Sequence, residues 1–131
     1  MIYLVIPCYN EQEVLEDSTK KLASLIGRMQ GEDMRILFSD DGSRDETWNI
    51  ICKLHHQYPF VEGIRLAHNE GHQKALWAGM EAAADRAEAI ISIDADLQDD
   101  IEVIPRMVAD FRQGADVVYG VRKERDTDSA F

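Results

Sequence analysis

Short apolar runs and longer segments with helical spacing alternate along most of this chain. Residues 2–6 form an apolar run that suits a strand buried on both faces, and Pro7 is expected to end it. In residues 11–29 the apolar side chains recur at spacings near three and four, which is typical of an amphipathic helix. Because strands that alternate with helices make right-handed crossovers, the chain is predicted to have an α/β fold, with a mostly parallel sheet and helices on both faces.

The same two patterns continue to residue 119. Further strands are expected over residues 35–38, 61–66, 89–93 and 116–119, and further helices over residues 45–56, 73–87 and 101–113. No linker, internal repeat or low-complexity stretch separates these segments, so residues 1–131 are predicted to form one domain. The charged tail after Gly120 has no apolar face and no closing strand, which indicates that the chain is cut short.

The composition excludes several classes of function. The formal net charge of −11 at pH 7 argues against a nucleic-acid partner, because proteins that bind duplexes rely on clustered Lys and Arg. No apolar run approaches the roughly 20 residues that span a bilayer. The first predicted strand follows Met1 directly, so no signal peptide is expected. Cys8 and Cys52 fall in a predicted strand and a predicted helix, which favours reduced thiols in a cytosolic setting.

Polar residues gather directly after the predicted strands. In an open α/β sheet, ligands bind beyond the carboxyl ends of the strands, so these segments form the candidate site. They are Pro-Cys-Tyr-Asn-Glu at 7–11, Ser-Asp-Asp-Gly-Ser at 39–43, His-Asn-Glu-Gly at 68–71 and Asp-Ala-Asp-Leu-Gln-Asp-Asp at 94–100.

The acidic segment 94–100 is the most specific of the four. Two carboxylates about 6 Å apart repel each other by roughly 3 kcal/mol at an effective dielectric constant near 20, so a divalent cation is expected to compensate Asp94 and Asp96. Mg²⁺ or Mn²⁺ suits such oxygen ligands, and Mg²⁺ takes one or two carboxylates together with substrate phosphates. Capping of the following helix is the alternative interpretation, and it is adopted for Asp99 and Asp100 only.

The segment after the second strand combines a turn with a helix start. Gly42 supplies backbone freedom, and Ser43 or Asp45 can cap the helix. Capping does not account for Asp40, which ends the strand and suits a hydrogen bond from an N–H group of a ligand, such as the edge of a nucleobase.

The remaining segments are open to two interpretations. Glu11 is either a functional acid or part of a helix N-terminus. Residues 71–74 lie where a helix begins, so free N–H groups and Lys74 can meet an anion there. His55, His56 and His68 are interpreted as structural, whereas His72 stays open because it follows a strand end. The apolar residues Leu76, Trp77 and Met80, and also Trp48, are expected in the core.

Taken in order, the motifs at residues 7–11, 40–45, 69–73 and 94–99 resemble those of the inverting family 2 glycosyltransferases. The resemblance covers the whole chain. Gln98, and Tyr-Gly-Val-Arg at 119–122, make it similar to the polyprenyl-phosphate members, including bactoprenol glucosyltransferases and dolichol-phosphate mannose synthases. Two positions depart from the pattern: His68 stands where an Arg is common, and Glu70 where an apolar or aromatic residue is usual.

The resemblance implies a nucleotide-diphospho-sugar transferase (GT-A) fold and a UDP- or GDP-sugar donor, with the UDP-sugar favoured. Asp94, Asp96 and Gln98 would hold Mg²⁺ or Mn²⁺ against the diphosphate, Asp40 would read the base, and Asp96 and Arg122 would serve catalysis. The nucleotide-sugar would contact Pro7, Tyr9, Asn10, Glu11, Asp40, Asp41, Gly71, Lys74, Asp94 and Ala95.

The acceptor implied by the resemblance is a polyprenyl phosphate, whose ionised oxygen would attack the anomeric carbon with inversion and without a protein base. Acceptor-side helices and membrane segments are then expected after Phe131, and they would place the enzyme on the cytoplasmic face of the membrane. A homo-oligomer is compatible with this arrangement. Two other hypotheses stay open: a family 2 transferase with a saccharide or protein acceptor and a carboxylate base beyond Phe131, and a non-catalytic nucleotide-binding module.

Overall fold

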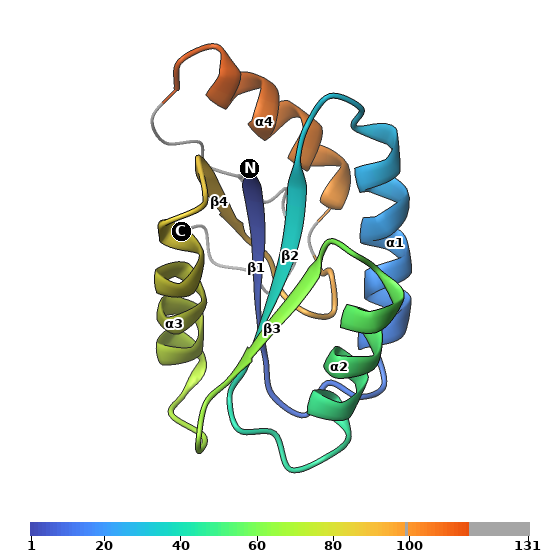
Figure 1. Cartoon of the computed structure of the whole chain (residues 1–131), viewed down its shortest axis with the longest axis vertical. Helices are drawn as coiled ribbons and strands as arrows, with labels where there is room; N and C mark the ends of the chain where they lie inside the picture. The colour runs from blue at the N-terminus through green and yellow to red at the C-terminus, as the bar shows by residue number, and fades with distance from the viewer. Residues whose placement is uncertain (99, 116–131) are drawn as a thin grey trace, which may run out of the picture. The chain divides into compact units, whose positions relative to one another are not determined.

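The computed structural model describes residues 1–98 and 100–115. Residues 1–98 form one compact unit, and residues 100–115 belong to a second. The first unit contains a parallel four-stranded sheet of order β3-β2-β1-β4, with β1 (Ile2–Cys8), β2 (Met34–Asp40), β3 (Val61–Arg65) and β4 (Ala89–Ser92). Its helices are α1 (Leu15–Arg28), α2 (Thr47–Gln57) and α3 (His72–Ala84), as Figure 1 shows. The predicted α/β fold with a parallel sheet is confirmed.

The two faces of the sheet carry different helices. Successive side chains along a strand point to opposite faces. Val5 and Leu37 pack with Ala83 of α3 on one face. On the other face, a Cβ added at Gly63 of β3 would lie 2.5 Å from the side chain of Ile51 in α2. Helices therefore cover both faces, with α3 on one and α2, which contacts α1, on the other (Figure 1).

β1 lies at the centre of the sheet, and all seven of its residues are buried. The prediction that Pro7 ends this strand is wrong, because β1 continues to Cys8 and pairs with β2 as far as Asp40. The carbonyl of Cys8 accepts a hydrogen bond from the β2 side, and the carbonyl of Val5 accepts one from the β4 side. Because the backbone polar groups of alternate residues in a strand face the same neighbour, the nitrogen of Pro7 faces β4, as the carbonyl of Val5 does. Pairing with β4 stops at Val5, and the missing N–H of Pro7 therefore leaves the β1–β2 ladder intact.

α1 begins at Leu15, four residues later than the predicted start. The N–H of Glu11 donates to Oγ1 of Thr47 at 2.8 Å, and the N–H of Gln12 donates to Asp45 at 3.4 Å. The segment after β1 is thus a turn bound to the start of α2, and the helix forms only beyond it.

α3 packs through small residues, and this explains why Trp77 is 63% exposed although it was expected in the core. Ala75, Gly79 and Ala83 are its buried residues. A Cβ added at Gly79 would lie 2.6 Å from the side chain of Val5, so this face has no room for a large side chain. Trp77 lies two positions from Ala75 and from Gly79, which turns it away from the sheet.

In the second unit the predicted helix 101–113 is a 3-10 turn, Ile101–Val103, followed by α4 (Ile104–Arg112). Pro105 stands in the first turn of α4, where its missing N–H costs no hydrogen bond. Asp100 accepts the N–H of Glu102 at 2.9 Å, which confirms its predicted capping role. Asp99 and the predicted strand 116–119 lie outside the described residues. Within the described part of the chain, no helix has the length and apolar character to cross a membrane.

Candidate functional site

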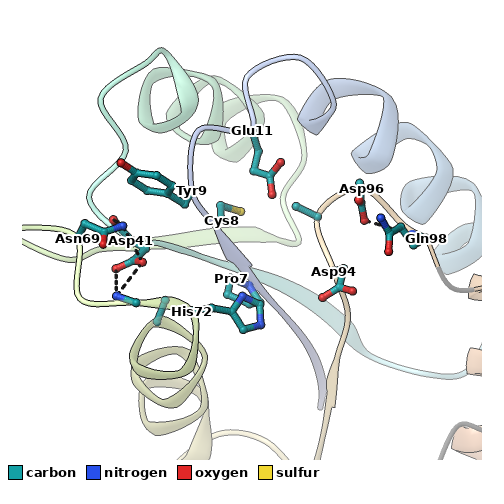
Figure 2. Close-up of a pocket in the computed structure, with 13 residues that line it drawn as sticks. Pro7, Cys8, Tyr9, Glu11, Asp41, Asn69, His72, Asp94, Asp96 and Gln98 are labelled. Carbon is teal, nitrogen blue, oxygen red and sulfur yellow. Dashed lines mark hydrogen bonds between the residues drawn. The ribbon is translucent and has the colours of Figure 1, made fainter. Parts of the chain in front are cut away.

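A pocket of about 540 Å³ lies at the carboxyl ends of β1, β2 and β4 (Figure 2). It is lined by Pro7, Cys8, Tyr9, Glu11, Asp41, Asn69, Gly71, His72, Ala75, Asp94, Ala95, Asp96 and Gln98. The strand-end segments, which are far apart in the sequence, therefore meet in one site. Of the predicted site residues, Asn10, Asp40 and Lys74 do not line this pocket, and Arg122 lies outside the described residues.

The loop after β1 forms one wall of the pocket. Figure 2 shows Tyr9 and Glu11 on this loop, with Glu11 across the pocket from Asp94. Asn10 has a positive φ of 52°, a conformation that Asn adopts more readily than most residues. Its N–H donates to Ser43 at 2.8 Å, and its side-chain oxygen accepts the N–H of Arg44 at 3.0 Å. Asn10 therefore joins two loops.

Asp40 is fully buried at the end of β2. Its Oδ1 accepts the N–H of Ser43 at 3.2 Å and also the Ser43 hydroxyl. Its Oδ2 lies 3.7 Å from Nε of Arg65 and has no hydrogen-bond partner among the described residues. A direct contact between Asp40 and a nucleobase stays a prediction.

Asp41 organises the loop before α3. Its carboxylate accepts the N–H of Glu70 at 2.7 Å and the N–H of Gly71 at 3.0 Å. The side-chain amide of Asn69 donates to the same carboxylate at 3.1 Å. The side chain of Asp41 is 3% exposed, so it borders the pocket while its oxygens serve the protein backbone. Lys74 lies in the first turn of α3, and its Nζ is 3.6 Å from a carboxylate oxygen of Glu70.

The acidic segment forms a tight turn directly after β4. The N–H of Ile93 donates to Val5 at 3.1 Å, which continues the sheet by one bond, and the N–H of Leu97 closes the turn on the carbonyl of Asp94 at 3.1 Å. Leu97 has a positive φ of 52°. Asp96 accepts the N–H of Gln98 at 3.3 Å (Figure 2). This geometry brings Asp94 and Asp96 into the pocket wall together.

The pocket has a strongly negative lining. Glu11, Asp41, Asp94 and Asp96 all line it, and within residues 1–98 and 100–115 no Lys or Arg does. Burial raises the pKa of Glu11, and the charges of Asp96, Asp94 and Asp45 raise it further, whereas His72 lowers it. Burial, followed by the charges of Glu11 and Asp40, also raises the pKa of the Cys8 thiol well above its ordinary value. An anionic ligand would need a compensating cation here.

Asp94, Asp96 and Gln98 supply oxygen donors of the kind that Mg²⁺ and Mn²⁺ prefer. The described residues contain no group of three or more His, Cys, Asp or Glu that could hold a metal ion by themselves. Two carboxylates and one amide oxygen fit Mg²⁺ in particular, because Mg²⁺ keeps its other positions for water and for substrate phosphates. The donor set therefore fits the expected cation.

Four pocket residues were not among the predicted site residues: Cys8, Asn69, His72 and Ala75. Cys8 and Asn69 belong to the strand-end motifs, so their position carried a signal. His72 stayed open in the sequence because it follows a strand end. Ala75 lies inside a predicted helix, and nothing in the sequence marks it as a pocket residue.

Comparisons with known proteins agree with this architecture. A family model described as Glycosyl transferase family 2 matches residues 3–131. The prophage bactoprenol glucosyl transferase homolog of Escherichia coli is 39% identical over 127 residues, 97% of this chain and 40% of its own length. The undecaprenyl-phosphate 4-deoxy-4-formamido-L-arabinose transferase of Pseudomonas fluorescens is 38% identical over 131 residues, 99% of this chain and 38% of its own length.

Among solved structures, S. aureus TarS in complex with UDP matches with a TM-score of 0.64 and 18% identity, over 85% of this chain and 32% of that chain. The likeness confirms the expected GT-A fold. The chain spans about 40% of the length of the curated relatives that it matches.

Proposed function

The chain belongs to glycosyl transferase family 2, and from this premise we propose that its pocket binds the nucleoside diphosphate part of a nucleotide-sugar donor with a divalent cation. One observation carries the proposal: Asp94 and Asp96 enter a pocket with two further carboxylates and without a Lys or Arg among the described residues. A diphosphate is repelled by such a lining unless a cation comes with it.

Asp94, Asp96 and Gln98 would hold Mg²⁺ or Mn²⁺. When bound, the cation supplies charge neutralisation of the diphosphate as it leaves the sugar. The start of α3 adds to this, because His72 lies in the pocket wall and a helix N-terminus carries positive partial charge that favours anions. Asp96 thereby serves catalysis through its charge and position, and proton transfer is not part of its role.

The loop after β1 would hold the nucleoside. Tyr9 is 41% exposed at the pocket and offers an aromatic face, and Pro7 and Glu11 line the same wall. Asp40 would read the base, as the family resemblance implies. We favour a UDP-sugar because the relatives include a bactoprenol glucosyl transferase homolog and the structural neighbour carries UDP, and a GDP-sugar is the second candidate.

We further propose that the whole protein transfers the sugar to a polyprenyl phosphate. The relatives named for bactoprenol and undecaprenyl phosphate support this acceptor class. An acceptor phosphate oxygen is already ionised near neutral pH, so it can attack the anomeric carbon directly as the bond to the diphosphate breaks. One displacement of this kind inverts the configuration. Arg122, outside the described residues, would contact the phosphates, and the reaction would take place at the cytoplasmic face of a membrane.

Calorimetric titration of the chain with UDP and GDP, in Mn²⁺ and in EDTA, tests the donor half of the proposal. We expect UDP to bind at least about tenfold more tightly in Mn²⁺, a gain of ~1.4 kcal/mol. Equal affinity for UDP in both conditions would contradict the proposal that a cation takes part in binding. Tighter binding of GDP than of UDP would contradict the preference for a uridine donor.

The acceptor half requires the full-length protein that contains this chain. Incubation with radiolabelled UDP-glucose and undecaprenyl phosphate should yield label in the organic phase. Label that appears only in a water-soluble saccharide or on protein would instead support the other acceptor classes.

A further inference from the structure

The hydroxyl of Ser18 on α1 donates a 2.6 Å hydrogen bond to the backbone carbonyl of Ala95. Both residues are buried, with exposures of 4% for Ser18 and 3% for Ala95, and they lie 77 positions apart in the sequence. This bond links a helix outside the pocket lining to the acidic turn inside it.

The next hydroxyl along α1, that of Thr19, forms a different kind of bond from the Ser18 hydroxyl. Thr19 is also buried on α1, but its hydroxyl donates to the carbonyl of Leu15, within the same helix, at 2.8 Å. Short polar side chains in helices commonly bond in this way to the carbonyl four residues earlier. Ser18 instead bonds out of its helix to the turn after β4, so its hydroxyl stabilises a contact between two separate elements.

The carbonyl of Ala95 belongs to the peptide unit that joins Ala95 to Asp96. A hydrogen bond to this oxygen limits rotation of the peptide unit, and the rotation sets the directions of the Asp94 and Asp96 side chains relative to each other. Two backbone bonds hold the ends of the turn: the N–H of Ile93 donates to the carbonyl of Val5 in β1, and the N–H of Leu97 donates to the carbonyl of Asp94. The bond from Ser18 to Ala95 holds the middle of the turn.

We propose that Ser18 is a positioning residue for the Asp94–Asp96 pair, which holds the two carboxylates in the arrangement that receives the divalent cation and the diphosphate. The inference rests on the proposed function of this pocket. Groups that orient metal ligands typically affect metal affinity by about 10- to 100-fold when removed, because ligands must be held within about 0.5 Å of their productive geometry.

The test compares Ser18→Ala with Thr19→Val, which removes a buried hydroxyl whose hydrogen bond stays within the same helix. Each variant of the chain is titrated with UDP in Mn²⁺ and with uridine in EDTA, and bound Mn²⁺ is followed by electron paramagnetic resonance. In Ser18→Ala we expect Mn²⁺-dependent affinity for UDP to fall about tenfold and the bound-Mn²⁺ spectrum to change. Uridine affinity should stay within about twofold. Thr19→Val and the hydroxyl-retaining Ser18→Thr should stay near wild type in both titrations.

Two results would overturn the inference. Ser18→Ala could match Thr19→Val in Mn²⁺, or it could lose uridine binding as strongly as Mn²⁺-dependent binding, which would indicate general damage. If Ser18→Ala does not fold, Ser18→Cys, with a weak S–H donor of similar shape, takes its place with the same expected direction. Failure of the proposed function is recognised separately, because Asp94→Ala and Asp96→Ala would then leave the effect of Mn²⁺ on UDP binding intact.

Discussion

The carboxylate of Asp41 accepts the backbone N–H of Gly71 at 3.0 Å, across 30 positions of the sequence. This bond fastens the end of the loop after β3 to the loop after β2, directly before α3 begins at His72. Asp41 therefore supports the pocket by placing the α3 N-terminus. The same carboxylate also receives the N–H of Glu70, so its capacity to accept from a ligand is largely used.

Replacement of Asp41 by Asn tests this supporting role. The new NH₂ group would face the N–H of Glu70 in one orientation, or the N–H of Gly71 and the side-chain amide of Asn69 in the other, so at least one of these donors would lose its acceptor. We expect urea unfolding to report a loss of about 1–3 kcal/mol, together with weaker UDP binding. Asp85→Asn, at an exposed position, is the control and should stay within about 0.5 kcal/mol of wild type. An unchanged stability for Asp41→Asn would show that the loop is held by other contacts.

Gly42 brings the same two loops into close contact. Its φ is 67°, and a Cβ added there would lie 2.6 Å from the carbonyl carbon of His68. Gly42→Ala should therefore cost about 3 kcal/mol or more in unfolding free energy, from backbone strain and steric overlap together. Gly31→Ala is the matched control, because Gly31 has a φ of 89° with nothing within 4 Å of the added Cβ. The unfolding free energy of Gly31→Ala should fall by only about 1–2 kcal/mol, from backbone strain alone. Equal losses in the two variants would contradict the close contact.

Glu11 is expected to destabilise the chain in the absence of ligand. Its pKa is raised by burial and then by Asp96 and Asp94, so the ionised form is less stable in the folded chain than in the unfolded one. A raised carboxyl pKa means that stability is lost as pH rises from the unfolded pKa through the folded pKa. Glu11→Gln should thus be more stable than wild type at pH 7, by less than about 1 kcal/mol because the side chain is partly exposed. Thermal unfolding from pH 3.5 to 7.5 should show this advantage disappear at acidic pH. An advantage that is the same at every pH would refute the electrostatic cause.

The pKa of Asp45 is shifted in the opposite direction to that of Glu11. Partial burial raises its pKa, but hydrogen bonds from the side chain and the N–H of Thr47 and from the N–H of Gln12 outweigh it, and the pKa is lowered overall. The stabilisation is present above the unfolded pKa and is lost as pH falls through the folded pKa, which lies below the ordinary value of an aspartate carboxyl. Wild type should be more stable than Asp45→Asn at pH 7, and the gap should narrow between about pH 5 and pH 2. Denaturant unfolding across this range measures it, and a gap that does not change with pH would count against the interpretation.

Most of the fold could be predicted from the periodicity of the apolar residues, and the location of the site could be predicted from the polar residues at the strand ends. Apolar runs predicted β1 and β2, whose residues are almost all buried, because burial on both faces of a parallel sheet demands such runs. The error at Pro7 arose because a proline interrupts a strand only if its nitrogen faces a paired neighbouring strand. Which neighbour the nitrogen of Pro7 faces, and how far that neighbour pairs, cannot be read from the local sequence. Trp77 was misplaced for a similar reason, since α3 approaches the sheet through Gly79 and leaves larger residues outside.

The contacts between loops could not be predicted. The sequence identified Asp40 and Asp41 as site residues alike, yet Asp40 is buried against Ser43 and Asp41 holds the backbone before α3. These roles depend on which loops meet at the sheet edge and on their exact approach. The link from Ser18 to Ala95 joins residues that share no motif, and only the three-dimensional packing of α1 beside the turn reveals it.

The central claim is that Asp94 and Asp96 hold the cation that neutralises the donor's diphosphate. Its most direct test is the ratio of UDP affinities measured by calorimetry in Mn²⁺ and in EDTA, for wild type, Asp94→Ala and Asp96→Ala. We predict that wild type gains at least about tenfold from Mn²⁺ and that each variant loses most of that gain while its affinity in EDTA does not fall. A gain from Mn²⁺ that is as large in both variants as in wild type would contradict the claim.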